Sequence, residues 1–293
     1  MELNKKIIIG TAQFGSNYGV TNKTGELSFS KIKKIVYESS KQNINFFDTS
    51  PTYGNAENKL GKSLKLNSKI ITKISGNKDN YFDKDNLRKI EKTFLKSLNN
   101  LKVNKIYGLL IHSTEDLYKK NNKILIDFLE DLKKNNIVEK IGVSIYQKKD
   151  YRNATKLFNP DIVQLPISIA DQRLLTNNFL SFLKKKNIEI HARSIFLQGL
   201  LISRTKSLPR NLIFFKNYLS SFDKKLKNNK LKPIDACLLF INNIKEIDKF
   251  IIGFTSLKEF KEILGINCKK RIKLNFFNQF RSNNVEILNP SNW

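Results

Sequence analysis

The chain has 293 residues, of which 40% are hydrophobic and 21 are phenylalanine. This length and composition allow a large buried core, which excludes wholesale disorder. The formal net charge of +27 suggests an anionic partner. However, all but eight of the 53 basic residues are lysine, and no arginine-aromatic motif suits nucleic acid. We expect a lysine-coated surface with no nucleic-acid or membrane partner, and an effect of the charge on anionic substrates remains open.

The N-terminal residues and the cysteines bear on location and redox state. Met1 to Lys6 leads into the apolar run Ile7 to Ile9, which is too short for a signal-peptide core or a membrane span. Cys237 and Cys268 have neither the spacing of a metal site nor the density of a disulfide scaffold. We therefore expect a cytoplasmic protein with reduced thiols and no metal.

Short apolar runs alternate with longer amphipathic segments, which is the pattern of βα units around a parallel sheet. The predicted strands are Ile7 to Gly10, Asn45 to Asp48, Ile70 to Lys73, Tyr107 to Ile111, Lys140 to Ser144, Ile162 to Leu165, Ile188 to Arg193 and Phe250 to Ile252. The predicted helices are Ser30 to Gln42, Glu57 to Ser63, Lys84 to Leu98, Asn122 to Lys134, Lys149 to Leu157, Asn178 to Lys186, a longer region after Pro209, and Leu257 to Leu264. Asp83, and Ser256 with Glu259 three residues later, indicate helix starts through capping chemistry.

Eight such alternations favour an α/β fold of the closed (β/α)8 type, the TIM barrel, over an open sheet. No linker, low-complexity segment or fixed-period repeat divides the chain, so we expect a single barrel domain spanning residues 1–293. Two segments fall outside the alternation, a long loop at 203–231 and a C-terminal tail at 271–293. Long loops after barrel strands often cover the active site.

Three ionisable residues end three predicted strands. Asp48 closes the run Asn45 to Asp48, Lys73 follows Ile70 to Thr72, and His112 follows Leu109 to Ile111. Catalytic side chains of barrel enzymes lie at these carboxyl ends. Tyr53 follows Asp48 closely, in a polar loop that leads into a helix.

These four side chains have a joint chemical logic. A tyrosine can protonate a developing alkoxide if a neighbouring cation stabilises its phenolate. Lys73 supplies that cation, Asp48 can hold Lys73 charged and oriented, and His112 can hydrogen-bond a carbonyl oxygen. Each residue alone has an ordinary structural explanation as a turn, surface or packing residue. Their joint placement at successive strand ends favours function.

The same residues carry a resemblance to the aldo-keto reductase superfamily. The segment Asp48-Thr49-Ser50-Pro51-Thr52-Tyr53-Gly54 with Glu57, then Lys73 and Ile111-His112, resembles the motifs of that family. Further matches lie along most of the chain, at Gly10 to Gly15, Ile141 to Ser144, Val163 to Pro166, Arg193-Ser194 with Gly199 to Leu201, and Ile252-Gly253.

The resemblance implies carbonyl reduction by hydride from NADPH or NADH. Tyr53 would be the general acid, tuned by Lys73 and Asp48, and His112 would orient the carbonyl. Ser144 and Gln164 would bind the carboxamide. The implied cofactor-binding residues are Gly10, Thr11, Asp48, Ser144, Gln164, Arg193, Ser194, Phe196, Gly199, Gly253, Ser256 and Lys258. The implied substrate contacts are Phe14, Tyr18, Tyr53 and His112.

Three positions depart from the family pattern. Ile145 stands where many members have asparagine, and Arg193 stands where an aromatic residue commonly stacks on the nicotinamide. A guanidinium plane can stack as well. Glu259 stands where an arginine often holds the 2′-phosphate of NADP, although Lys258 and Lys261 are near in sequence. The cofactor preference is open, with a slight lean to NADPH from the habit of the family.

Other functions remain as alternatives. One is a nicotinamide-binding sensor or partner subunit of the same fold with little or no catalysis. The presence of the whole tetrad, Asp48, Tyr53, Lys73 and His112, argues against it. Another is a sugar-modifying oxidoreductase of surface polysaccharide synthesis, because the segment Arg193 to Gly199 resembles the corresponding segment of such enzymes. The sequence determines neither the substrate nor the oligomeric state, because the loops that select a substrate are the least constrained by the barrel.

Overall fold

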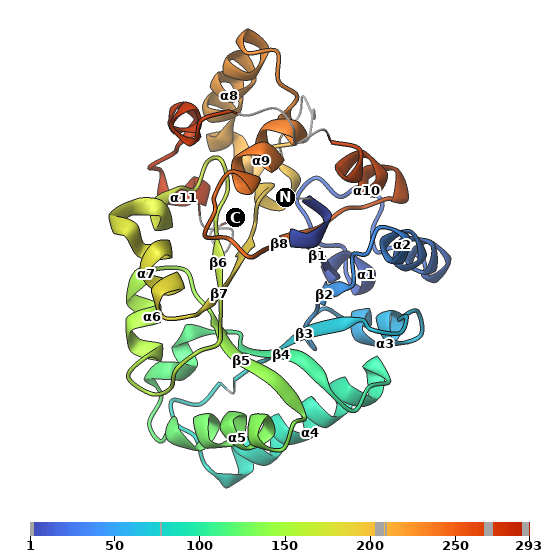
Figure 1. Ribbon diagram of the computed structural model, residues 1–293, viewed down its shortest axis with the longest axis vertical. Helices are drawn as coiled ribbons and strands as arrows, with labels where there is room; N and C mark the ends of the chain where they lie inside the picture. The colour runs from blue at the N-terminus through green and yellow to red at the C-terminus, as the bar shows by residue number, and fades with distance from the viewer. Residues whose placement is uncertain (1–2, 77, 203–207, 209, 267–271, 289–292) are drawn as a thin grey trace.

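The computed structural model describes residues 3–76, 78–202, 208, 210–266, 272–288 and 293. Eight parallel strands form a closed barrel in which each strand pairs with the next and β8 pairs with β1. Figure 1 shows the strands at the centre with helices around them. The strands are β1 (Ile7–Gly10), β2 (Phe46–Asp48), β3 (Lys69–Ile74), β4 (Ile106–Ile111), β5 (Val138–Ser144), β6 (Ile162–Pro166), β7 (Glu189–Arg193) and β8 (Lys249–Ile252). The expected (β/α)8 barrel is therefore confirmed.

Helices connect the strands. The α-helices are α1 (Ala12–Gly15), α2 (Phe29–Lys41), α3 (Ala56–Gly61), α4 (Lys84–Leu101), α5 (Lys123–Lys134), α6 (Lys148–Ala154), α7 (Phe179–Lys185), α8 (Lys216–Asn228), α9 (Pro233–Asn242), α10 (Leu257–Leu264) and α11 (Val285–Leu288). The 3-10 helices are η1 (Leu3–Lys6), η2 (Thr114–Tyr118), η3 (Arg173–Asn178), η4 (Leu197–Gly199), η5 (Arg210–Phe215) and η6 (Leu274–Phe280). None of the described helices is long and apolar enough to cross a membrane.

Alternation along the strands separates two apolar regions. On β1, Ile7 and Ile9 face the large cluster between strands and helices, whereas Ile8 belongs to a smaller cluster. That smaller cluster also contains Phe46, Ile71, Tyr107, Leu110 and Ile162, which come from four further strands. A barrel interior filled in this way is a packed core. It separates the two ends of the barrel from each other.

Capping residues set the helix starts where the sequence indicates them. The Asp83 side chain accepts a hydrogen bond from the Asn86 N–H at the start of α4, at 2.7 Å. Ser256 Oγ accepts from the Glu259 N–H at the start of α10, at 3.1 Å. These bonds satisfy N–H groups that have no partner inside the helix. Both predicted helix starts are confirmed.

The region after Pro209 is more divided than the sequence pattern suggests. Its described part contains η5, α8 and α9, so the described residues of the expected loop at 203–231 are largely helical. Lys230 has a positive φ of 53°, and Pro233 begins α9, so the chain turns between α8 and α9. Residues 203–207 and 209 lie outside the described residues.

The C-terminal tail at 271–293 also contains helix in its described part, because η6 and α11 lie there. Gln172 donates a hydrogen bond to the carbonyl of Phe277 at 2.9 Å, and Phe280 packs edge-on against Phe222 of α8. These contacts join the tail to the loop after β6 and to α8. Residues 271 and 289–292, together with Cys268, lie outside the described residues, whereas Cys237 is buried.

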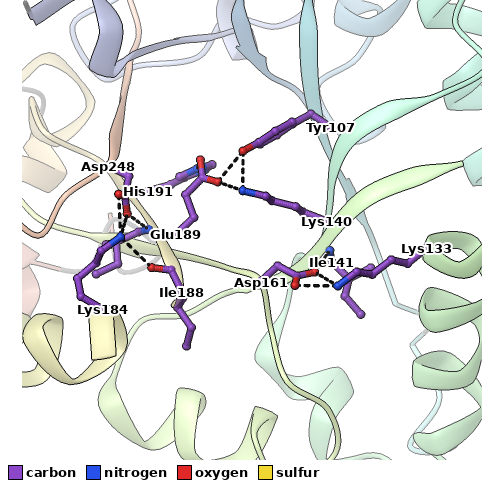
Figure 2. Close-up of polar contacts among 11 residues, drawn as sticks. Tyr107, Lys133, Lys140, Ile141, Asp161, Lys184, Ile188, Glu189, His191 and Asp248 are labelled. Carbon is purple, nitrogen blue, oxygen red and sulfur yellow. Dashed lines mark hydrogen bonds and ion pairs between the residues drawn. The ribbon is translucent and has the colours of Figure 1, made fainter. Parts of the chain in front are cut away.

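The amino ends of the strands carry a polar network, drawn in Figure 2. Glu189 on β7 accepts hydrogen bonds from Tyr107 at 2.6 Å and from Lys140, and its other oxygen pairs with His191 Nε2 at 2.8 Å. Burial by itself raises the pKa of Glu189, but bonding to His191 and to Lys140 outweighs it and depresses this pKa strongly. Glu189 therefore stays ionised at the amino end of the barrel.

Candidate active site

The four residues singled out in the sequence lie around one cavity of about 640 Å³. Asp48 is the last residue of β2, and Lys73 is the last but one of β3, which continues one residue further than predicted. His112 follows β4 directly, and its N–H donates to Ile74 O at 3.0 Å. Tyr53 lies on the loop between β2 and α3. The cavity thus opens at the carboxyl ends of the strands, the catalytic face of this architecture.

A buried ion pair forms the floor of this cavity. Lys73 Nζ lies 2.6 Å from Asp48 Oδ1 and donates to Thr49 O at 2.9 Å. Gln164 Nε2 donates to Asp48 Oδ2 at 2.8 Å. Burial alone lowers the pKa of Lys73, but the charge of Asp48 and the hydrogen bonds with Asp48 and Tyr53 outweigh it, so this pKa is raised. Lys73 is therefore a fixed ammonium group.

Local backbone geometry places Tyr53 next to that ammonium. Residues Ser50 to Tyr53 form a turn in which the Tyr53 N–H donates to Ser50 O at 3.0 Å, and Pro51 occupies the position that proline favours. Lys73 Nζ lies 5.2 Å from the Tyr53 ring centroid. The His112 ring stands almost perpendicular to the Tyr53 ring, with 6.4 Å between centroids. The Tyr53 ring therefore lies close to both a cation and an imidazole.

Burial and, after it, the charges of Lys73 and Arg193 together lower the pKa of His112 to about 4, against the opposite effect of Asp48. The imidazole is consequently neutral near pH 7. A neutral imidazole has one N–H donor and one acceptor nitrogen. It can donate to a carbonyl oxygen without adding a full charge.

Glu57 on α3 supports the strand that carries Lys73. Its carboxylate is buried and accepts a hydrogen bond from Thr72 Oγ1 at 2.8 Å. Burial raises the pKa of Glu57, although hydrogen bonds from Thr72, Ser97 and Asn100 act in the other direction. Thr72 is adjacent to Lys73, so this contact fixes β3 from its outer side.

Most of the other expected site residues line the same cavity. Those that do are Gly10, Thr11, Tyr18, Ser144, Gln164, Arg193, Ser194, Phe196, Gly199 and Gly253. Phe14, Ser256 and Lys258 do not line it. Phe14 is fully buried in the core between strands and helices, so its expected substrate contact finds no support in the geometry. Sequence alone could not distinguish a buried ring from a cavity wall in this segment.

Several lining residues were not singled out from the sequence. They include Gln13, Thr21, Asn22, Tyr146, Gln198, Lys232 and Glu262. Tyr146 follows β5 by two residues, so the strand-end rule that identified Asp48 and His112 would also have reached it. The others come from loops and helices that only the tertiary structure brings to the cavity.

The loop after β7 approaches the cavity in an unusual backbone conformation. Ser194, Leu197 and Gln198 have φ values of 61°, 45° and 53°. Side chains other than glycine seldom adopt this left-handed region, and such conformations cluster at functional sites. The loop therefore has a conformation that its surroundings must hold in place.

The three departures from the family pattern have distinct positions. Ile145 is fully buried in the core, and its carbonyl accepts a hydrogen bond from Arg193 Nη2 at 3.2 Å. The Arg193 guanidinium lies 4.3 Å from the ring centroid of Tyr146. Glu259 lines the cavity, where its carboxylate accepts from the N–H and the hydroxyl of Thr255 at 2.7 and 2.8 Å.

The donor set near the tetrad fits a nicotinamide carboxamide. A carboxylate can only accept hydrogen bonds, so Gln164 must direct its NH2 group at Asp48 and keeps its carbonyl oxygen for another donor. Ser144, the Cα partner of Gln164 across β5 and β6, adds a hydroxyl to the same wall. An amide presents one acceptor and two N–H donors, which these two groups complement.

The chain is a TIM-barrel protein whose cavity lies at the catalytic face of the barrel. The family model of the Aldo/keto reductase family matches residues 6–283, and the chain belongs to this family. It is accordingly an NAD(P)H-dependent oxidoreductase. Comparison with curated proteins finds no match.

Solved structures share the fold at low sequence identity. An aldo-keto reductase from Bacillus halodurans in its holo form is 18% identical, with a TM-score of 0.73 over 94% of this chain and 91% of that one. A glycerol dehydrogenase from Gluconobacter oxydans is 16% identical, with a TM-score of 0.70 over 96% and 90%. A mutant of Gox0644 in complex with NADPH is 18% identical, with a TM-score of 0.63 over 95% and 90%.

Proposed function

We propose that this protein reduces an aldehyde or ketone, with Tyr53 as the general acid. The observation that carries the proposal is the convergence of the buried Lys73–Asp48 pair, Tyr53 and His112 on one cavity. Three strands and one loop deliver these groups to the same end of the barrel. A structural role for each of them separately does not account for that convergence.

The side chains divide the work. The bound nicotinamide cofactor supplies the hydride. His112 donates its single N–H to the carbonyl oxygen and orients it, while Tyr53 gives its phenolic proton to the oxygen as negative charge develops there. Lys73 stabilises the phenolate that remains, and Asp48 holds Lys73 in position. Ser144 and Gln164 hold the carboxamide of the cofactor.

The first test removes the acid and keeps the ring. Tyr53→Phe should lower kcat for aldehyde reduction by about 100-fold or more, which is the usual contribution of general acid catalysis. The measurement is the loss of reduced-nicotinamide absorbance with a panel of aldehydes. Fluorescence titration should give the same cofactor Kd for the variant and the wild type. Equal kcat values would remove Tyr53 from the mechanism.

The sensor alternative predicts a different result. A protein that only binds the cofactor would show a normal Kd with no turnover on any member of a broad panel, nucleotide sugars included. The same panel tests the sugar-modifying alternative, because preferential turnover of sugar carbonyls would favour it. The cytoplasmic location remains a prediction from the sequence.

We propose further that the cofactor is NADH, whereas the habit of the family favours NADPH. Glu259 and Glu262 line the cavity, as does Lys232, whereas Lys258 and Lys261 do not. We assign this end to the adenosine half of the cofactor, where a carboxylate accepts hydrogen bonds from ribose hydroxyls and repels a 2′-phosphate. The amide and hydroxyl of Thr255 hold the Glu259 carboxylate in place.

Cofactor titration tests this preference without turnover. The wild type should bind NADH about tenfold or more tightly than NADPH, because a carboxylate beside a phosphate costs more than 1.4 kcal/mol at close range. The double variant Glu259→Gln and Glu262→Gln should narrow the ratio of the two Kd values. Glu130→Gln, on the exposed face of α5, is the matched control. Tighter binding of NADPH by the wild type would overturn the preference.

A further inference from the structure

Arg193 is a cation in the cavity that has no anionic partner among the described residues. Its guanidinium donates to Ile145 O at 3.2 Å and to Ser194 Oγ at 3.4 Å, and both acceptors are neutral. The cation at the floor of the same cavity, Lys73, is paired with Asp48. The side chain is half-buried, so its guanidinium loses part of its hydration and gains no counter-charge in return. An unpaired cation of this kind in a ligand cavity indicates a ligand that supplies the counter-charge.

The guanidinium is held rather than free to swing away. Its central carbon lies 4.3 Å from the centroid of the Tyr146 ring. Its two hydrogen bonds fix the planar guanidinium group at the end of β7. Nε is buried and has no hydrogen-bond partner, so the N–H groups that remain for a ligand are on the Nη atoms. A planar, pre-oriented fork of this kind binds a carboxylate or phosphate through two donors.

The position of Arg193 is at the reacting end of the cavity. Burial is the main cause of the low His112 pKa, and Lys73 and Arg193 lower it further. Partial burial and the neighbouring Tyr53 raise the pKa of Tyr18 to about 12 against the opposing charge of Arg193, and 41% of the Tyr18 side chain is exposed. Tyr18 and His112 thus both lie within the field of the guanidinium. Tyr18 remains protonated and can add a hydroxyl donor to the same place.

The family resemblance also places Arg193 beside the nicotinamide, but the cofactor does not offer a suitable anion at that end. The nicotinamide ring is neutral when reduced and positively charged when oxidised, and a ribose separates it from the phosphates. A carbonyl held by Tyr53 and His112 is, in contrast, within a few bonds of any acidic group of a small substrate. Pairing with the substrate therefore accounts for the charge of Arg193 better than pairing with the cofactor does.

We propose that Arg193, backed by Tyr146, binds an anionic group of the substrate, so that the preferred substrate is a small carbonyl compound that carries a carboxylate or phosphate. The inference rests on the proposed carbonyl reduction and names the substrate class for it. The net charge of +27 acts in the same direction, because a basic protein attracts small anions at long range.

Matched substrate pairs test the proposal through a ratio. The pairs are D-glyceraldehyde with its 3-phosphate, and butanal with 4-oxobutanoate, at constant ionic strength. The wild type should show a kcat/KM about tenfold to a hundredfold higher for the anionic member, the range of a hydrogen-bonded charge pair. Arg193→Gln should bring this ratio close to one, and Arg193→Lys should retain part of it. The ratio cancels any effect of the variant on folding or cofactor binding.

One control variant makes the ratio decisive. Arg152→Gln removes an exposed arginine on α6 and should leave the ratio unchanged. The pair with the larger ratio distinguishes phosphate from carboxylate as the group recognised. A wild-type ratio near one, or a ratio that Arg193→Gln does not change, would overturn the proposal.

Calorimetry separates this inference from the proposed reduction, because it needs no turnover. Glycerol 3-phosphate should bind the wild-type protein and bind Arg193→Gln at least about tenfold more weakly, whereas Arg152→Gln should match the wild type. This result would support the anion subsite even if no aldehyde is reduced, in which case the proposed function alone fails. Equal binding to all three proteins would assign the affinity to surface lysines and reject the subsite.

Discussion

His112 is a titrating residue whose environment sets its charge. The chain has only two histidines, at 112 and 191, so its imidazole signals are few. Burial, together with the charges of Lys73 and Arg193, lowers the pKa of His112 to about 4. The ordinary value, near 6.5, applies to the unfolded chain. The unfolded state therefore binds more protons between about pH 6.5 and pH 4, and the stability of the fold falls as the pH drops through that window.

We expect the Cε1–H resonance of His112 to titrate with a midpoint near pH 4 in a proton NMR titration. The variant His112→Gln assigns this resonance by deleting it. The same variant should lose less stability than the wild type between pH 6.5 and pH 4.5 in urea unfolding, because the uptake of this proton is gone. A His112 midpoint above pH 6 would contradict a neutral imidazole at the active site.

At the scale of elements, a close backbone contact sets the position of Tyr53. A Cβ added to Gly15, the last residue of α1, would lie 2.1 Å from Tyr53 O and 2.3 Å from Ala56 N. Gly54 has a φ of 56°, and a Cβ added to it would lie 2.1 Å from Gly15 O. The short helix after β1 therefore packs directly on the turn that carries the proposed acid. Only glycine permits this distance.

Gly15→Ala should displace this turn by about 1 Å and lower kcat by about 100-fold, because misplacement of that size in a catalytic group has such an effect. The measurement is kcat together with the far-ultraviolet circular dichroism spectrum, which should change little. Gly265→Ala, at the end of α10, is the matched control, since its new Cβ would meet the nearest atom at an ordinary 3.4 Å. If both variants keep full activity, the Gly15 contact does not position Tyr53.

At the scale of the whole molecule, the two ends of the barrel have different roles. The amino ends of the strands carry a repeated brace, visible in Figure 2. Asp161, just before β6, accepts from Lys133 of α5 and from the Ile141 N–H of β5. Asp248, just before β8, accepts from Lys184 of α7 at 2.8 Å and from the Ile190 N–H of β7 at 2.8 Å. The same bracing occurs two βα units apart, far from the cavity.

Asp248→Ala should lower the free energy of unfolding by about 1–3 kcal/mol, because the buried Ile190 N–H loses its side-chain partner. The kcat/KM value should equal that of the wild type, because residues at the amino end of a barrel serve stability and the active site lies at the other end. Denaturant unfolding and steady-state kinetics give the two quantities. Asp223→Ala, exposed on α8, is the control that should change neither. A large loss of activity with unchanged stability would reverse the roles assigned to the two ends.

Much of the fold can be read from local patterns. The strand Ile7 to Gly10 coincides with β1, and Asp83 and Ser256 begin α4 and α10 as their capping chemistry predicts. Capping and alternation depend on neighbours within a few residues, which a sequence displays directly. The amphipathic pattern after Pro209 does not separate α8 from α9, although Pro233 marks the start of α9. The turn between these helices uses a left-handed residue, Lys230, whose residue type does not favour that conformation.

The sequence by itself determined the barrel and placed Asp48, Lys73 and His112 at the ends of consecutive strands, because parallel strands in a closed barrel must present their carboxyl ends together. Only the tertiary structure decided what those ends enclose. It buries Phe14, brings Tyr146 under Arg193, and leaves that guanidinium without an anionic partner among the described residues. These contacts join residues far apart in the chain, so their energies depend on distances that local sequence does not encode.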